Sequence, residues 1–131
     1  MKVHGGVARF RALACELPGA TESSHMGVPD FRAHGRIFAT LSGEARGRGV
    51  LKLTPEQQAE FVSELPDVFE PVQGGWGRMG MTYVILDRAD DETMRGALMT
   101  AYRNIGQKAA ANRTKKAKPK AAGTARRRSE A

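Results

Sequence analysis

The residues Gly75-Trp76-Gly77-Arg78-Met79-Gly80 satisfy the G-x-G-x-x-G spacing that cradles dinucleotide phosphates in other proteins. That role requires a strand before the motif and a helix after it, whose N-terminus meets the pyrophosphate. Here the motif is followed by the strand-like run Met81–Leu86, so the spacing does not indicate a dinucleotide site. The glycines favour a tight turn with Trp76 packed against a sheet. The alternative is that Trp76 and Arg78 contact a ligand through stacking and charge.

Arginine and histidine side chains gather in the expected connections between strands. Arginines in such connections can contact phosphates, because the guanidinium donates two parallel hydrogen bonds to phosphate oxygens. The alternative is ordinary solvated arginine, with Asp30 and Glu44 as nearby partners. The candidate nucleic-acid contacts of the body are Arg32, His34, Arg36, Arg46, Arg48 and Arg78.

The C-terminal segment is strongly basic. From residue 108 onward nine Lys and Arg face one acid, which gives +8 and leaves −1 for the rest of the chain, whose total is +7. Such a segment binds DNA or RNA without sequence preference through counterion release, and a solubilising extension is the alternative. It holds no aromatic residue, which argues against base stacking. Its candidate contacts are Lys115, Lys116, Lys118, Lys120, Arg126, Arg127 and Arg128.

Metal-binding and nucleophilic patterns are not apparent in the sequence. His4, His25 and His34 share no metal-ligand spacing with one another or with Cys15. Cys15 lies beside the apolar stripe of the first helix, so we expect a small buried hydrophobic residue without a partner base. The acids at 90–92 are explained by helix capping. We therefore expect no metal, no cofactor and no enzymatic activity.

Length and composition predict one folded domain. The chain has 131 residues, of which 40% are hydrophobic, enough for a single core. A single cysteine, no signal-peptide pattern and no apolar run of 18 residues indicate a cytoplasmic protein. We expect a domain over residues 1–107. Residues 108–131 have too little apolar surface to fold, so we expect a disordered tail that is helical at most in its first turns.

The elements that must position these residues follow from periodicity and turn signals. Thr54-Pro55-Glu56-Gln57 is a capping box that starts a helix ending at Pro66. Asp90 or Asp91 caps a last helix with an apolar stripe of Met94, Leu98, Ala101, Tyr102 and Ile105. The other expected elements are a helix over Gly6–Leu17, strands over Thr21–Met26, Asp30–Ala33, Ile37–Leu41, Val50–Leu53 and Met81–Leu86, and an extended crossover over Val68–Gln73.

The hairpin of Asp30–Ala33 and Ile37–Leu41 is the centre of this arrangement. Its turn is His34-Gly35-Arg36, where Gly35 can adopt a positive φ. The order of elements predicts an α+β fold with a mostly antiparallel sheet packed against helices.

The order of several segments over roughly residues 10–109 resembles the MmcQ/YjbR family. Leu17-Pro18-Gly19-Ala20-Thr21-Glu22 and the glycine motif before the last strand contribute most to this likeness. The resemblance implies a CyaY-like fold, described as a double-wing DNA-binding architecture, and no set of catalytic residues. Frataxin-like iron handling is not favoured, because the first helix offers only Glu16 as an acid, beside Arg9 and Arg11.

Together these observations predict a small non-enzymatic protein that binds DNA without sequence preference. The basic tail would supply affinity, and the loop arginines would orient the body on the phosphates of duplex DNA. No membrane partner is expected. The alternative is a protein- or ligand-binding adaptor that uses the segment Gly74–Gly80 and the sheet surface.

Overall fold

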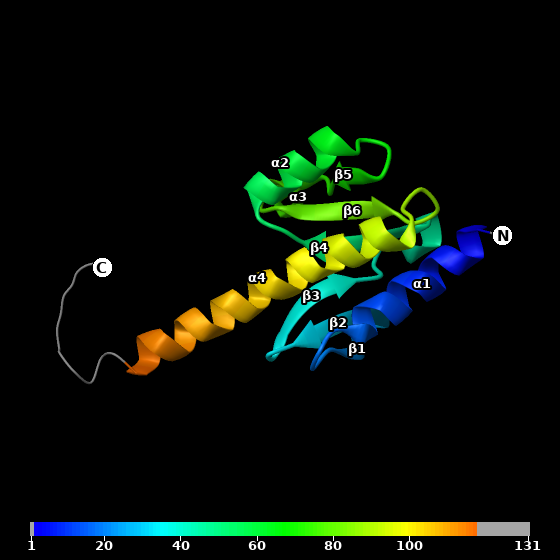
Figure 1. Ribbon diagram of the computed structural model, residues 1–131. Helices are drawn as coiled ribbons and strands as arrows, with labels where there is room; N and C mark the ends of the chain where they lie inside the picture. The colour runs from blue at the N-terminus through cyan, green and yellow to red at the C-terminus, as the bar shows by residue number, and fades with distance from the viewer. Residues whose placement is uncertain (1, 118–131) are drawn as a thin grey trace.

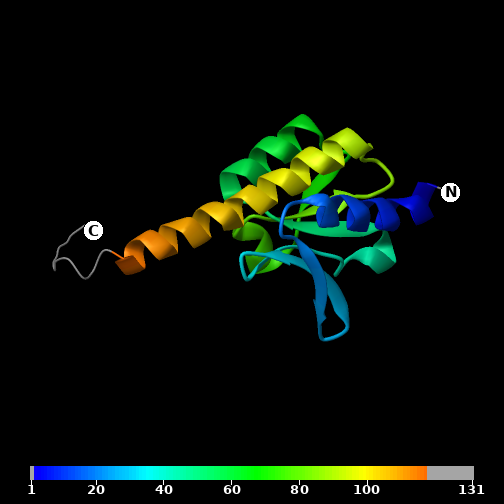
Figure 2. The same ribbon diagram turned by 60° about the horizontal axis from the view of Figure 1, so that its bottom comes forward.

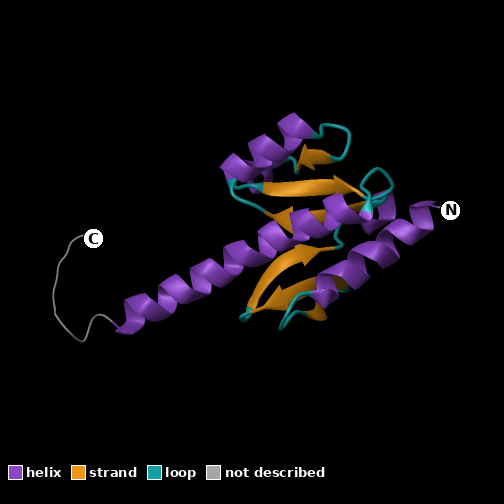
Figure 3. Cartoon of the chain, in the orientation of Figure 1, coloured by secondary structure: helices purple, strands orange, loops and turns teal. Residues whose placement is uncertain are grey.

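The computed structural model describes the backbone of residues 2–117 and side chains from residue 6 to residue 107 (Figure 1). A first helix is followed by three consecutive strands, and the remaining strands are interspersed with helices (Figure 3). In chain order they are α1 (Lys2–Glu16), β1 (Thr21–His25), β2 (Val28–Ala33), β3 (Arg36–Thr40), the 3-10 turn η1 (Glu44–Arg46), β4 (Arg48–Lys52), α2 (Pro55–Glu64), β5 (Phe69–Pro71), α3 (Gly74–Arg78), β6 (Met81–Ile85) and α4 (Asp91–Ala117).

The six strands form one antiparallel sheet in the order β1-β2-β3-β4-β6-β5. Helices α1, α2 and α4 lie together on one face of the sheet (Figure 2). The α+β fold predicted from the sequence is therefore confirmed. β6 lies between β4 and β5, so β5 forms the edge of the sheet that α2 covers.

The core lies between the sheet and helices α1 and α4. Phe10 of α1 meets Phe31 of β2 edge to face, with ring centroids 5.9 Å apart. The expected stripe of α4 is confirmed, because Met94, Leu98, Ala101 and Ile105 are buried and Tyr102 packs partly against the core. Among the described side chains, the last core residue along α4 is Ile105.

The predicted start signals of α2 and α4 are confirmed. Thr54 Oγ1 accepts a hydrogen bond from the Gln57 amide at 3.1 Å, and the Thr54 amide donates to Gln57 Oε1 at 3.0 Å. Asp90 Oδ1 accepts from the Thr93 amide at 2.8 Å, so Asp90 caps α4.

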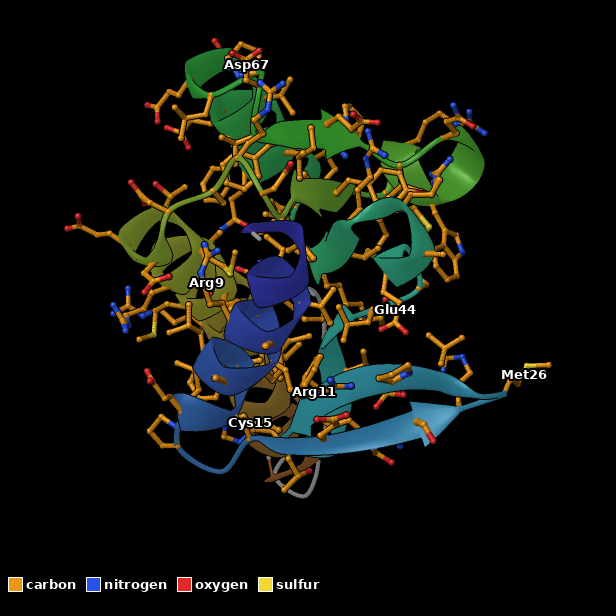
Figure 4. All side chains as sticks on the ribbon, turned by 90° about the vertical axis from the view of Figure 1, so that its right-hand side faces the viewer. Arg9, Arg11, Cys15, Met26, Glu44 and Asp67 are labelled. Carbon is orange, nitrogen blue, oxygen red and sulfur yellow. The ribbon has the colours of Figure 1, made fainter. Side chains whose placement is uncertain are left out.

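The predicted hairpin is β2–β3, and its turn is confirmed at His34-Gly35. Both residues have positive φ, 55° and 73°, as a type I′ turn requires. The register shifts between Phe31 and Arg32, a bulge that the sequence pattern did not indicate. The preceding hairpin, β1–β2, extends away from the body with Met26 at its tip, 94% exposed (Figure 4).

Three local predictions are wrong or incomplete. Segment 74–80 is not a simple tight turn with Trp76 packed against the sheet, because Gly74–Arg78 forms helix α3 and the Trp76 side chain is 58% exposed. Cys15 is exposed rather than buried, because it lies on the side of α1 that faces away from the core, whereas Ala14 is in the core. The expected crossover over Val68–Gln73 contains the short edge strand β5.

Helix α4 continues well past the core and projects from the body (Figures 1 and 2). Residues 108–117 are thus helical, at about 1.5 Å per residue a rod of roughly 15 Å. The expectation of disorder for residues 118–131 lies outside the described part of the chain. Among the described helices, none has the length and apolarity needed to cross a membrane.

Candidate nucleic-acid interface

Arg32 is engaged by the buried carboxylate of Asp30. Two positions apart on β2, both residues lie on the same face of the strand. Arg32 donates through Nε and Nη2 to the two Asp30 oxygens at 2.7 and 3.0 Å, and His25 Nδ1 lies 3.2 Å from Oδ2. The Arg32 guanidinium, and secondarily the His25 hydrogen bond, lower the pKa of Asp30 against the opposing effect of burial. Arg32 is therefore paired within the protein, and its partner is the Asp30 that the alternative to phosphate contact had named.

Arg46 and Arg48 gather around the ring of Tyr83, on the sheet face opposite α1 and α4. Their guanidinium carbons lie 5.6 and 5.7 Å from the ring centroid. Arg46 also donates to the Tyr83 hydroxyl at 3.2 Å, and Arg48 pairs with Glu70 at 3.3 Å. These contacts stabilise the cluster and leave Arg46, which is exposed, as its more accessible cation.

His34 and Arg36 lie at the other end of the sheet, where α4 leaves the body (Figure 1). The ring of His34 is 6.0 Å from that of Tyr102 on α4. Arg36 lines a groove of about 500 Å³, which we call the exit groove. Its walls come from the start of β3, the end of β4, the start of α2, the segment before β6, and α4.

Lys52 is the cation of the exit groove that sequence reasoning missed. It is the last residue of β4 and lines the groove together with Asn104 and Gln107 of α4. The Asn104 amide donates to the Lys52 carbonyl at 3.3 Å and forms a reciprocal pair with the Gln57 amide at 2.7 and 3.2 Å. These bonds join α4, β4 and α2, so rigid elements form the walls. No local signal marks Lys52, because the groove exists only once the five segments meet.

Helix α3 presents Trp76, Arg78 and Met79 to solvent. The Met79 side chain is 69% exposed and also lines the exit groove. Gly77, by contrast, is buried, and Gln58 Nε2 donates to its carbonyl at 3.0 Å and to that of Met81 at 2.8 Å. Gly77 therefore allows a close approach of α3 to its neighbours, while Trp76 faces outward.

The ion pairs of the described side chains separate engaged from free cations. The engaged cations, with their partners, are Arg9 with Asp91, Arg11 with Glu22, Arg32 with Asp30, Arg48 with Glu70 and Arg95 with Glu16. Between residues 6 and 107, by the same criterion, Arg36, Arg46, Lys52, Arg78, Arg88 and Arg103 have no carboxylate partner. Of these, Arg36 and Lys52 are brought together at the exit groove.

The predicted tail contacts fall into two groups. Lys115 and Lys116 lie on the projecting part of α4, together with Lys108 and Arg113. Lys118, Lys120 and Arg126–Arg128 lie outside the described residues. Between Thr93 and Ala117, α4 carries six Lys or Arg and no acid. The backbone thus carries this basic stretch directly away from the exit groove.

Neither the tip of the β1–β2 hairpin nor a metal site among the described residues adds to the candidate nucleic-acid interface. The tip of the β1–β2 hairpin, Met26-Gly27, carries no charge. Glu22 of β1 accepts a 2.9 Å hydrogen bond from Arg11 of α1, which lies beside the hairpin (Figure 4). Within the searched, described part of the chain, no group of three His, Cys, Asp or Glu side chains is placed to hold a metal ion.

Comparison with known proteins places this chain in a family. The crystal structure of Deinococcus radiodurans protein DR2400, domain DUF419, is similar with a TM-score of 0.59 and 20% identity, over 73% of this chain and 75% of that one. At that identity the likeness shows a shared fold only. No curated protein matches the sequence significantly. The YjbR family model matches residues 15–104, more than half of the chain. The chain therefore belongs to the YjbR family, as its segment order indicated.

Proposed function

We propose that this protein binds the phosphate backbone of nucleic acid without sequence preference, and that it acts as a binding module rather than an enzyme. The observation that carries the proposal is the projecting part of α4, which extends four cations beyond the body without an intervening acid. Each phosphate neutralised by such a cation releases counterions, and this supplies affinity for any sequence.

Within the described body, the part that supports this role is the end of the sheet that holds the exit groove. Arg36 and Lys52, both without a carboxylate partner between residues 6 and 107, lie where the basic helix leaves the sheet. Arg32 and Arg48, in contrast, are held by Asp30 and Glu70. The helix and the exit groove would then form one continuous contact, with the remaining loop arginines outside it.

The test is the salt dependence of duplex DNA binding by the full chain. If all nine cations of residues 108–131 contact phosphates, log affinity falls with log salt at a slope of at most about −8. Replacing the four cations of residues 108–117 by Gln, a good helix former, should make the slope shallower by up to about 4. Fluorescence anisotropy of a labelled 20-base-pair duplex measures both.

A control removes two positive charges outside the projecting segment, so its effect is compared per charge removed. Arg88→Gln combined with Arg103→Gln changes two exposed cations outside the projecting segment, and we expect little change in slope. A salt-independent affinity of the full chain, or an equal effect of both variants per charge removed, would contradict the proposal.

The exposed Trp76 and Met79 favour a second candidate, an adaptor that binds a protein or small ligand through α3. This candidate predicts that Trp76→Ala abolishes binding of that partner, while the Gln variant of residues 108–117 leaves it intact. The proposal of nucleic-acid binding predicts that the Gln variant has the larger effect on duplex affinity.

A further inference from the structure

The exit groove combines cations with an apolar floor. Of the residues that line it, Arg36 and Lys52 are charged and none is a carboxylate. Met79, Met81 and Ile105 supply apolar surface. Its volume of about 500 Å³ lies in the range of small-ligand sites rather than of surfaces that receive a whole duplex. Charge complementarity therefore favours an anion with a flat or apolar part.

Trp76 is the exposed aromatic residue of α3, the helix that leads into Met79 of the groove. It lies three residues before Met79, a spacing that makes the two side chains neighbours on one side of α3. Because Gln58 bonds two carbonyls around α3 and Gly77 lies against the Val72 backbone, the helix is fixed and the indole is presented on a rigid element. An exposed aromatic face on a fixed support is the arrangement on which unpaired bases stack.

We infer that the exit groove and Trp76 bind single-stranded nucleic acid, with an unpaired base stacked on the indole and adjacent phosphates at Arg36 and Lys52. This inference rests on the proposed function and specifies the strand state that the body recognises. Bases in a duplex are stacked on each other and do not offer a free π-face, whereas unpaired bases do. Residues 118–131 are a poor occupant, because their five cations would repel Arg36 and Lys52.

Trp76 is the only tryptophan, so intrinsic fluorescence reports this site directly. We expect a 12-nucleotide oligo-dT to quench the emission, since stacked bases quench indole. A 12-base-pair duplex should bind, as seen by anisotropy of a labelled end, while leaving the emission nearly unchanged. Binding of the duplex with equal quenching would overturn the inference.

Substitutions separate stacking from charge. Trp76→Leu should weaken oligo-dT binding about 10-fold, while Trp76→Phe retains most of the affinity. Arg36→Gln and Lys52→Gln should each reduce the salt slope for oligo-dT by about 1. Arg88→Gln, at an exposed position outside the groove, is the matched control and should leave both quantities unchanged. Thermal melts followed by circular dichroism verify that each variant folds. Because Trp76 is exposed, we expect its substitution to leave the fold unchanged.

The outcomes separate this inference from the proposed function. If neither duplex nor oligo-dT binds, the proposed function fails. If the duplex binds with a steep salt slope but oligo-dT neither quenches nor depends on Trp76, only the groove inference fails. If an acidic peptide containing Phe quenches Trp76 as strongly as oligo-dT does, the groove accepts a protein segment and the inference is overturned.

Discussion

Gly77→Ala is expected to destabilise the protein by displacing α3. A Cβ at this position would lie 1.6 Å from the carbonyl oxygen of Val72 and 2.7 Å from its carbon. Both are backbone atoms, so they cannot swing aside as the end of a long side chain can. The helix would have to shift by at least about 1.5 Å to bring this contact to a normal separation.

The magnitude follows from what that shift breaks. Overpacking of this kind costs about 1–3 kcal/mol. The hydrogen bond from Gln58 to the Gly77 carbonyl would also weaken, which adds roughly 0.5–1.5 kcal/mol. We expect a loss of about 2–4 kcal/mol in the free energy of unfolding.

Gly75→Ala is the matched control within the same helix. A Cβ there meets only Arg78 Nη2 at 3.6 Å, an ordinary contact. Alanine loses less conformational entropy than glycine in a helix, so this variant should be unchanged or up to about 1 kcal/mol more stable. The first glycine of the motif is thus dispensable for packing, whereas the second is required.

Far-UV circular dichroism followed during urea unfolding and during heating measures both variants. Because 1 kcal/mol corresponds to roughly 4–8 °C in Tm for a domain of this size, Gly77→Ala should melt at least about 8 °C lower than the parent chain. Equal stability of the two variants would refute the close approach of α3 to Val72.

Three further predictions concern local contacts. Thr54→Ala should cost about 1 kcal/mol in urea unfolding, because it removes the acceptor of the Gln57 amide; an unchanged midpoint would contradict the capping box. Asp30→Asn should cost on the order of 1–3 kcal/mol at pH 7, because a carboxylate that accepts two bonds from Arg32 is lost. Because the folded pKa of Asp30 is lowered, the stability that its carboxylate contributes is complete above the unfolded pKa of about 3.9 and is lost as pH falls through the folded value. The difference in free energy of unfolding between parent and variant should therefore disappear in acid. A difference that stays constant with pH would refute the pairing. Cys15 is exposed, so a maleimide should label the folded chain, more slowly than free cysteine because partial desolvation raises the pKa of its thiol; labelling only after denaturation would contradict its placement.

The distribution of charge explains why the helix extension carries the proposed function. The body up to residue 107 has a net charge of −1, and five of its described arginines are paired with acids. The extension has no acid until Glu130. A polyanion would therefore meet the extension first and the body only at the groove where α4 emerges.

Much of the fold could be predicted from the sequence because its signals are local. The Thr54 capping box, the Asp90 cap and the His34-Gly35 turn each depend on residues within four positions of one another. The stripe of α4 depends only on the helical period, and its members are buried as expected. Family membership likewise followed from the order of these segments.

The sequence alone therefore determined the elements, the cap residues and the separation of a nearly neutral body from a basic C-terminal segment. The tertiary structure decided which cations are free, since Arg48 meets Glu70 only through the pairing of β4 and β5 with β6. It also turned Trp76 outward, because Gly77 occupies the buried side of α3 against Val72. The exit groove cannot be recognised in any single segment of the sequence. Arg36, Lys52 and Met79 come together only when three distant parts of the chain pack, and long-range contacts rather than local preferences set that packing.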